Sequence, residues 1–216
     1  MTSLGLPAEI TAYLLPELLE LLHTLPVSFL ESLEEIRLRQ GQPILVCSGV
    51  GDGFLCRLGG LTQQAKEAIW ADNAMLQKMV LLLSGSSFYA MEEELRCGYI
   101  TLPGGHRAGL TGQGVLEKGY IRTLKNISSI NLRLARAVYG AGDDFLPYMV
   151  EKGAVCHTLL ASPPRAGKTT VLRDLVRQLA DGAMGLPPYN VAVADERSEI
   201  AGCVNGCPQL PVGYRT

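Results

Sequence analysis

The sequence predicts an α/β protein: an N-terminal α+β domain with an antiparallel meander, followed by the beginning of a P-loop core. Residues 162–169 read S-P-P-R-A-G-K-T and match the phosphate-loop pattern G-x-x-x-x-G-K-[ST] except at the first position. An apolar run of strand character, residues 154–161, precedes this pattern, and apolar residues at helical spacing follow it. Upstream, residues 98–135 hold short strand-like runs separated by turn residues.

The composition allows a substantial core, in one large domain or two smaller ones. The chain has 216 residues, 47% of them hydrophobic, and a formal net charge of −2. This acidic balance argues against a nucleic-acid partner. No apolar run approaches the roughly 20 residues of a transmembrane helix, and the N-terminus lacks the pattern of a secretory signal. The cysteines are scattered, and Cys203 and Cys207 lack a second ligand pair for zinc, so we expect reduced thiols in a cytosolic protein.

The N-terminal part begins with a leucine-rich segment. Residues 11–25 predict one helix that starts or is interrupted near Pro16. Its buried stripe is predicted to be Leu15, Leu18, Leu19 and Leu22. Residues 34–39 alternate between apolar and charged, which indicates a strand, and residues 43–47 predict a second one. The glycine-rich residues 49–60 are expected to form a hairpin connection.

Two capped helices are expected next. Asp72 or Asn73 can cap a helix over residues 74–83, because both side chains accept hydrogen bonds from free amides of a first helical turn. The serines at 86 and 87 can cap another, with glutamates 92–94 in its first turns.

From residue 98 the pattern changes to strands and tight turns. Runs at 98–102, 106–116, 120–124 and 130–135 predict an antiparallel meander. Glycines and aspartates within 138–144 then mark a boundary, which divides the chain into domains 1–140 and 141–216. A short helix is expected over residues 145–150, before the phosphate-loop strand.

The phosphate loop carries a specific chemistry. Backbone N–H groups and the start of a helix bind phosphate oxygens, but Pro163 and Pro164 have no N–H, so the donors must come from later residues. Lys168 is expected to reach the β- and γ-phosphates, and the Thr169 hydroxyl to bind Mg²⁺. The predicted cofactors are ATP and Mg²⁺, and the predicted cofactor-binding residues are Arg165, Ala166, Gly167, Lys168, Thr169 and Thr170.

An acidic stretch follows a second apolar run. Residues 190–194 predict a core strand, and D-E-R-S-E occupies residues 195–199. Ligands bind at the carboxyl ends of parallel strands, so these carboxylates are expected to face the nucleotide. Glu196 and Glu199 are candidates for positioning the attacking water, with Asp195 nearer Mg²⁺, although spacing alone allows these roles to exchange. The alternative is an acidic loop that pairs with Arg197 or Arg215.

Basic residues are concentrated in the segment before the nucleotide core. Residues 96–136 contain seven basic side chains and one acidic side chain. Residues 1–95 contain twelve acidic and five basic side chains. The basic segment is either a solvated sheet face or a surface that binds anions or another subunit.

Several stretches together resemble the stage III sporulation protein AA family, ATPases of endospore formers that are similar to type II and type IV secretion ATPases. The stretches are E-E-I-R-L-R (34–39), Y-A-M-E-E-E-L-R (89–96), G-Y-I-T-L-P-G-G-H-R (98–107), S-S-I-N-L-R (128–133), R-A-G-K-T-T (165–170), D-E-R-S-E-I-A-G (195–202), P-Q-L (208–210) and G-Y-R-T (213–216). They are spread over nearly the whole chain.

The resemblance implies an N-terminal domain packed on a RecA-like core and a homo-hexamer. It also implies a cytoplasmic, mother-cell location, peripheral to a membrane, with membrane-bound sporulation channel proteins as partners. The acidic stretch would correspond to the Asp box of the secretion ATPases. The family continues beyond G-Y-R-T into Walker B strands, so we expect a truncated core here and an inactive 216-residue form.

Within such a ring, an arginine of the basic segment is expected to act on nucleotide bound to a neighbouring subunit. Arg107 is the first candidate, because Gly104 and Gly105 would place it just past a tight turn. Further candidates are Arg122, Arg133 and Arg136. The competing interpretation is contact with acidic proteins or phospholipid headgroups.

The leading functional hypothesis is an ATP-driven motor subunit of a sporulation channel. One alternative is a nucleotide-dependent structural or docking component that hardly turns over. Another is an unrelated small P-loop NTPase, which the long α+β domain before the phosphate loop disfavours.

Overall fold

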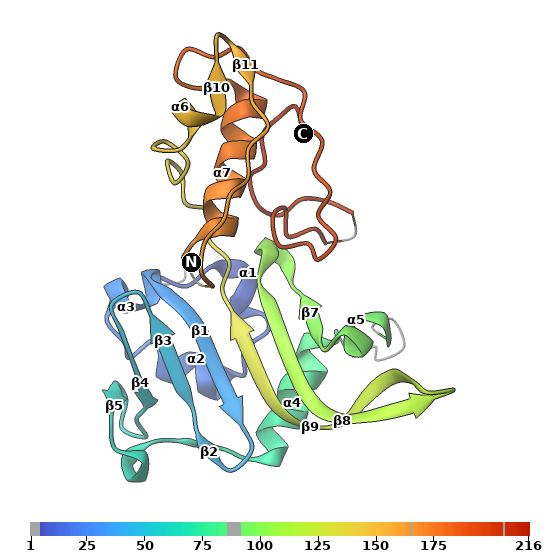
Figure 1. Ribbon diagram of the computed structural model, residues 1–216. Helices are drawn as coiled ribbons and strands as arrows, with labels where there is room; N and C mark the ends of the chain where they lie inside the picture. The colour runs from blue at the N-terminus through green and yellow to red at the C-terminus, as the bar shows by residue number, and fades with distance from the viewer. Residues whose placement is uncertain (1–4, 86–91, 165, 205) are drawn as a thin grey trace. The chain divides into compact units, whose positions relative to one another are not determined.

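The computed structural model describes residues 5–85, 92–164, 166–204 and 206–216 (Figure 1). The chain divides into two compact units, Met1–Ala135 and Arg136–Thr216. The sequence pattern places the division after residue 140. Each unit has its own secondary structure and its own apolar core.

Three short helices open the first unit, and the second of them begins at Pro16, where the leucine-rich pattern allows its helix to start. They are α1 (Ala8–Thr11), α2 (Pro16–Leu22) and α3 (Val27–Glu31). Pro16 is the first residue of α2 and Pro26 is the N-cap of α3, and proline cannot continue a preceding helix because it has no N–H. Of the predicted buried leucines, Leu15, Leu18 and Leu22 are buried in the core, and Leu19 is partly buried against it.

The next helix begins where the capping residues predict it. α4 (Asn73–Leu83) has Asp72 as its N-cap, and the backbone N–H of Met75 donates to the Asp72 carboxylate at 2.7 Å. This bond satisfies one of the free amides of the first turn. α5 (Glu92–Cys97) follows, and the serines expected to cap it lie outside the described residues.

An antiparallel sheet of seven strands forms the body of the first unit, in the order β5-β4-β3-β1-β9-β8-β7 (Figure 1). Its strands are β1 (Leu33–Arg39), β3 (Leu45–Ser48), β4 (Gly51–Leu55), β5 (Leu61–Thr62), β7 (Tyr99–Thr101), β8 (Arg107–Glu117) and β9 (Tyr120–Arg133). The predicted meander is confirmed as β7-β8-β9, and β9 also pairs with β1. The remaining elements of this unit are the strand pair β2 (Gln42–Pro43) and β6 (Trp70–Ala71) and the 3-10 helices η1 (Ala65–Glu67) and η3 (Pro103–Gly105).

Two details of this sheet differ from the prediction. The glycine-rich segment 49–60 contains a strand of its own, β4, which pairs with β3. The two strands expected at 120–124 and 130–135 are one continuous strand, β9. The ladder between β8 and β9 shifts register between Thr111 and Gln113, and Asn126 of β9 is left-handed with φ 50°. The pairing continues on both sides of this bulge, so the strand does not end there.

One face of the sheet is apolar and packs on helices, and the other face is polar. Ile36 and Leu38 of β1 lie opposite Leu132 and Ile130 of β9, and all four side chains are fully buried. They belong to one cluster with apolar residues of α2, α3 and α4. The alternating residues of β1 and β9 point the other way, so the charged side chains of these strands gather on the opposite face.

The second unit is built around α7 (Lys168–Asp181), which directly follows the phosphate loop. Before it come α6 (Leu146–Met149) and a hairpin of β10 (Val150–Glu151) and β11 (Ala154–Val155). Both helices are confirmed predictions. Two apolar clusters lie along α7: one joins Leu175 and Leu179 to Leu146, and the other joins Val176 to Ala201 and Val212.

The parallel strands predicted on either side of α7 are not seen in the part of the chain that the structure describes. Of the run 154–161, only Ala154 and Val155 are in a strand, and their partner β10 is antiparallel. The run 190–194 belongs to no strand. An extended segment becomes a strand only where a neighbour completes its hydrogen bonds, and neither run has a parallel neighbour among the described residues. Leu159 is consequently 90% exposed.

Candidate nucleotide-binding site

The phosphate loop ends in a left-handed glycine that starts α7. Gly167 has φ 81°, is the N-cap of the helix, and has open space where a Cβ would stand. Lys168, Thr169 and Thr170 form the first turn of α7, where backbone N–H groups have no partner within the helix. These free amides and the positive end of the helix dipole favour an anion at this position.

A cavity of about 690 Å³ lies in front of this helix start. Lys168 and Thr169 line one part of it, and Asp195, Glu196 and Glu199 of the acidic stretch line another. The remaining wall is mainly apolar, with side chains that include Phe145, Tyr148, Met149, Leu159 and Leu172. The volume falls within the range of about 300–1,000 Å³ that is usual for small-molecule sites. The fold therefore brings together the phosphate-loop residues and carboxylates that the sequence singles out separately.

Three other predicted cofactor-binding residues lie next to Lys168 and Thr169 in the chain. Ala166 and Gly167 precede Lys168 and are exposed, and Thr170 follows Thr169 and is half-buried. Their expected contribution is through backbone N–H groups, which need no side chain in the cavity. Arg165 lies outside the described residues.

The acidic stretch folds into a loop around its first carboxylate. Asp195 Oδ1 accepts the N–H of Glu199, and Asp195 Oδ2 accepts the N–H groups of Ile200 and Ala201, each at 2.9 Å. Ser198 adopts a left-handed conformation with φ 53°. Asp195 thus organises the loop, while the side chains of Glu196 and Glu199 are exposed at the cavity.

Arg173, for which the sequence predicts no role, is a further charged residue next to the acidic loop. Arg173 comes from α7 and is only 9% exposed. Its Nε donates to the carbonyl of Ile200, and its Nη2 donates to the carbonyl of Glu199 at 2.7 Å. Burial lowers the pKa of this guanidinium, and the charge of Asp195 partly offsets the shift. The sequence does contain a signal for the burial of Arg173, because this residue stands between Leu172 and the buried residues Leu175 and Val176 of α7.

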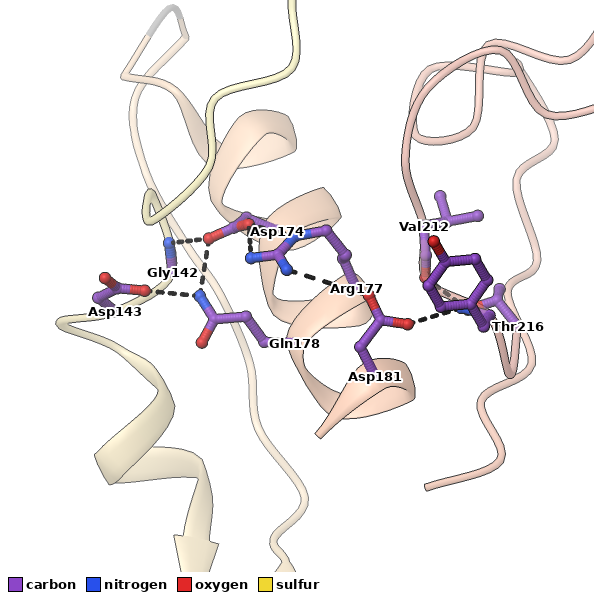
Figure 2. A network of polar contacts seen from close by, with 9 residues as sticks. Gly142, Asp143, Asp174, Arg177, Gln178, Asp181, Val212 and Thr216 are labelled. Carbon is purple, nitrogen blue, oxygen red and sulfur yellow. Dashed lines mark hydrogen bonds and ion pairs between the residues drawn. The ribbon is translucent and has the colours of Figure 1, made fainter. Parts of the chain in front are cut away.

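A second polar network runs along α7 toward its C-terminal end (Figure 2). Asp174, only 3% exposed, accepts the N–H of Gly142 at 2.9 Å, the side chain of Gln178 at 2.7 Å and the guanidinium of Arg177 at 2.7 Å. Burial alone would raise the pKa of Asp174, but these donors outweigh burial and lower it. The Asp181 carboxylate accepts the backbone N–H of Tyr214 at 2.7 Å. The network ties the segments before and after α7 to the helix.

Arg107, the predicted trans-acting arginine, belongs to the first unit. It is the first residue of β8, and its guanidinium lies 3.5 Å from the ring centroid of Tyr99. Other arginines of the basic segment have charged partners: Arg133 lies 3.8 Å from Glu35, and Arg122 lies 3.0 Å from Glu117. The action of Arg107 on a nucleotide stays a prediction.

The carboxylates at the cavity do not form a metal centre by themselves. Within the described ranges, no group of three or more histidine, cysteine, aspartate or glutamate side chains is placed to hold a metal ion. This arrangement fits Mg²⁺ delivered with a nucleotide, because Mg²⁺ in such sites uses one or two protein oxygens together with phosphates. Thr169 and one acidic side chain would be sufficient.

Comparison with known proteins gives the family. The family model for sporulation stage III, protein AA matches residues 8–216. The chain belongs to this family. It is also similar to stage III sporulation protein AA of Bacillus subtilis (strain 168), with 38% identity over 183 residues. The match covers 85% of this chain and 55% of that protein, so the chain spans about half the length of this curated relative. No solved structure matches.

In this member of the sporulation stage III protein AA family, the G-G-H-R stretch forms a compact turn. Gly104 is left-handed with φ 79°, and a Cβ there would lie 2.9 Å from the His106 ring. His106 is buried, and its Nδ1 accepts the N–H of Ala135 at 3.0 Å. The histidine therefore fixes the end of the first unit. None of the described helices is both long enough and apolar enough to span a membrane.

Proposed function

We propose that this chain supplies the ATP- and Mg²⁺-binding part of an ATP-hydrolysing motor subunit of a sporulation channel between mother cell and forespore. One observation carries the proposal: Lys168, Thr169 and the carboxylates of residues 195–199 line a single cavity. Phosphoryl transfer depends mainly on positioning and on electrostatic stabilisation of phosphate oxygens, and these are the groups that supply both.

Each group has a distinct task in this proposal. The amides of the first turn of α7 and the ammonium of Lys168 bind the β- and γ-phosphates. The Thr169 hydroxyl would hold Mg²⁺, which would supply positive charge against the phosphate oxygens. Glu196 or Glu199 orients the attacking water, because an exposed carboxylate at the cavity can accept a proton from it. The apolar wall around Phe145 gives the adenine base of the nucleotide a surface to pack against.

The proposed assembly is a homo-hexamer on the cytoplasmic face of the mother-cell membrane, where it acts on membrane-bound channel proteins. The relative from B. subtilis is named for stage III of sporulation, and this name supports a role of the chain in sporulation. The separate basic segment supports contact with a charged partner, since residues 96–136 carry seven basic side chains and one acidic side chain.

Substitutions at the cavity test the proposal in the full-length protein. Lys168→Ala should weaken binding of a fluorescent ATP analogue at least about tenfold, because a direct phosphate contact is lost. Glu196→Gln and Glu199→Gln should leave binding within about threefold, and at least one should slow hydrolysis about 100-fold. Lys152→Met, which removes an exposed charge in the turn between β10 and β11, is the matched control.

The outcomes separate the hypotheses. Equal affinity of wild type and Lys168→Ala for the ATP analogue would contradict the assignment of a nucleotide site at Lys168. Tight binding with no turnover in any form would identify a nucleotide-dependent docking component instead. Normal hydrolysis in both glutamine variants would leave the acidic stretch with a purely structural role.

A further inference from the structure

Two consecutive peptide groups of the acidic loop are each held from both ends by charged side chains. In the peptide between Glu199 and Ile200, the N–H donates to Asp195 and the carbonyl accepts from Arg173. In the peptide between Ile200 and Ala201, the N–H again donates to Asp195 and the carbonyl again accepts from Arg173. Arg173 and Asp195 therefore hold the backbone next to Glu199 between a cation and an anion, and we call this pair the clamp.

The clamp extends directly from the phosphate-loop helix. Arg173 lies on α7, which begins at Lys168, so Arg173 is about one and a half helical turns beyond the phosphate-binding lysine. A third contact, from Arg173 Nη1 to the carbonyl of Arg136 at 3.5 Å, holds the start of the second unit to the same guanidinium. The planar guanidinium of an arginine presents its N–H donors in a fixed fork, whereas the three donors of a lysine ammonium lie on one nitrogen at the end of a flexible stem.

We infer that Arg173 and Asp195 are a pair of positioning residues that set the Glu196 and Glu199 carboxylates at a fixed place relative to Lys168 and Thr169. The inference rests on the proposed function for its catalytic consequence. It gives Asp195 a different role from the metal-ligand role predicted from the sequence, because both of its oxygens already accept backbone N–H groups. Of the three carboxylates in the stretch, Glu196 and Glu199 serve the reaction.

Positioning of this kind has a measurable effect on rate. A displacement of about 1 Å in a catalytic group can reduce the rate about 100-fold, while phosphate binding by a separate loop is unaffected. Loss of the clamp should therefore lower kcat and leave nucleotide affinity nearly unchanged. It should also release the three amides held by Asp195.

The test compares Arg173→Met and Asp195→Asn with Glu196→Gln and Glu199→Gln in the full-length protein. Hydrogen exchange at amides 199, 200 and 201 should accelerate about tenfold in the first two variants and stay unchanged in the glutamine variants. The amides of α7 should keep their protection in all four. Affinity for a non-hydrolysable ATP analogue with Mg²⁺ should stay within about threefold, and kcat should fall at least about tenfold.

Two further variants make the readout specific. Arg173→Lys keeps the charge and reaches fewer carbonyls, so its exchange rates and kcat should lie between those of wild type and Arg173→Met, and it also serves if Arg173→Met fails to fold. Lys152→Met removes a positive charge elsewhere in the unit and should change nothing.

Each result decides one part of the inference. Unchanged exchange at amides 199–201 in both Arg173→Met and Asp195→Asn would overturn the clamp. Faster exchange with an unaltered kcat would overturn its catalytic consequence. A wild-type protein without hydrolysis would refute the proposed function, and the exchange data would still show whether the clamp exists.

Discussion

Asp174 shows how one buried carboxylate can be retained within an apolar helix face. It has three donors: the Gly142 N–H, the Gln178 amide and the Arg177 guanidinium. Without these partners a buried charge would cost more than folding supplies. Figure 2 shows that the donors come from α7 itself and from the segment before it, so the carboxylate connects the two.

Replacement of Asp174 by asparagine should destabilise the C-terminal unit by about 2–4 kcal/mol at pH 7, because the amide NH₂ would face existing donors. The folded-state pKa of Asp174 is lowered, so its stabilisation is fully present above the unfolded-state pKa of about 4 and is lost as pH falls through the folded-state value. The variant should therefore lose less stability than wild type between pH 5 and 2.

Denaturant unfolding followed through hydrogen exchange of α7 amides measures both effects. Asp144→Asn, at an exposed aspartate nearby, is the control and should resemble wild type. Identical pH dependence in wild type and Asp174→Asn would contradict the assigned role.

At the scale of elements, the last residues of the chain pack closely on the end of α7. Gly213 has φ 95°, and a Cβ there would lie 2.5 Å from the Ala180 Cβ and 3.0 Å from the Arg177 carbonyl. Tyr214 N–H then donates to Asp181, and the Arg215 carbonyl accepts from Val191. The G-Y-R-T stretch therefore holds α7 and the segment near residue 191 together.

Gly213→Ala should cost about 3 kcal/mol or more, because it adds a clash with backbone and core atoms to the strain of a left-handed residue. Gly185→Ala is a matched control, since Gly185 has φ 81° but open space where its Cβ would stand. That variant should lose only about 1–2 kcal/mol from backbone strain. Thermal or denaturant unfolding measures both, and equal losses would show that the close approach at Gly213 carries no cost.

At the scale of the whole molecule, the proposed hexamer gives the first unit a role in the reaction. Arg107 and the cavity residues belong to different units, Met1–Ala135 and Arg136–Thr216. An arginine supplied by a neighbouring subunit can stabilise charge that develops during phosphoryl transfer. Arg107, which is half-buried, would first have to leave the Tyr99 ring, and a cation–π contact is worth about 0.5–2 kcal/mol.

Mixed assemblies test this role in the full-length protein. Arg107→Ala and Lys168→Ala should each be inactive alone and recover part of the activity when co-assembled. In a random 1:1 mixture about a quarter of the interfaces would pair an intact Lys168 with an intact Arg107.

A mixture of Lys168→Ala with the glutamine variant that abolishes hydrolysis, Glu196→Gln or Glu199→Gln, should recover nothing, because both defects fall in the same site. Full activity of Arg107→Ala alone, or no recovery in verified mixed hexamers, would remove Arg107 from this role.

Local patterns predict much of the first unit. Asp72 caps α4 as expected, because an N-cap depends on a side chain and an amide three residues apart. The alternation in β1 and the turns of the meander are also visible in sequence, since period and turn chemistry are local properties. The continuity of β9 is not visible in sequence, because its pairing with β8 on both sides of Asn126 is what keeps the strand in one piece.

In the second unit, local patterns predict α6 and α7 and single out the phosphate loop and the acidic stretch as a candidate site. The roles inside the acidic stretch follow from contacts that only the folded chain makes. Asp195 turns inward to three amides, and Arg173 reaches the loop's carbonyls from 26 and 27 residues earlier in the chain. Side-chain direction in a loop follows from partners distant in sequence, and spacing between carboxylates contains no information about them.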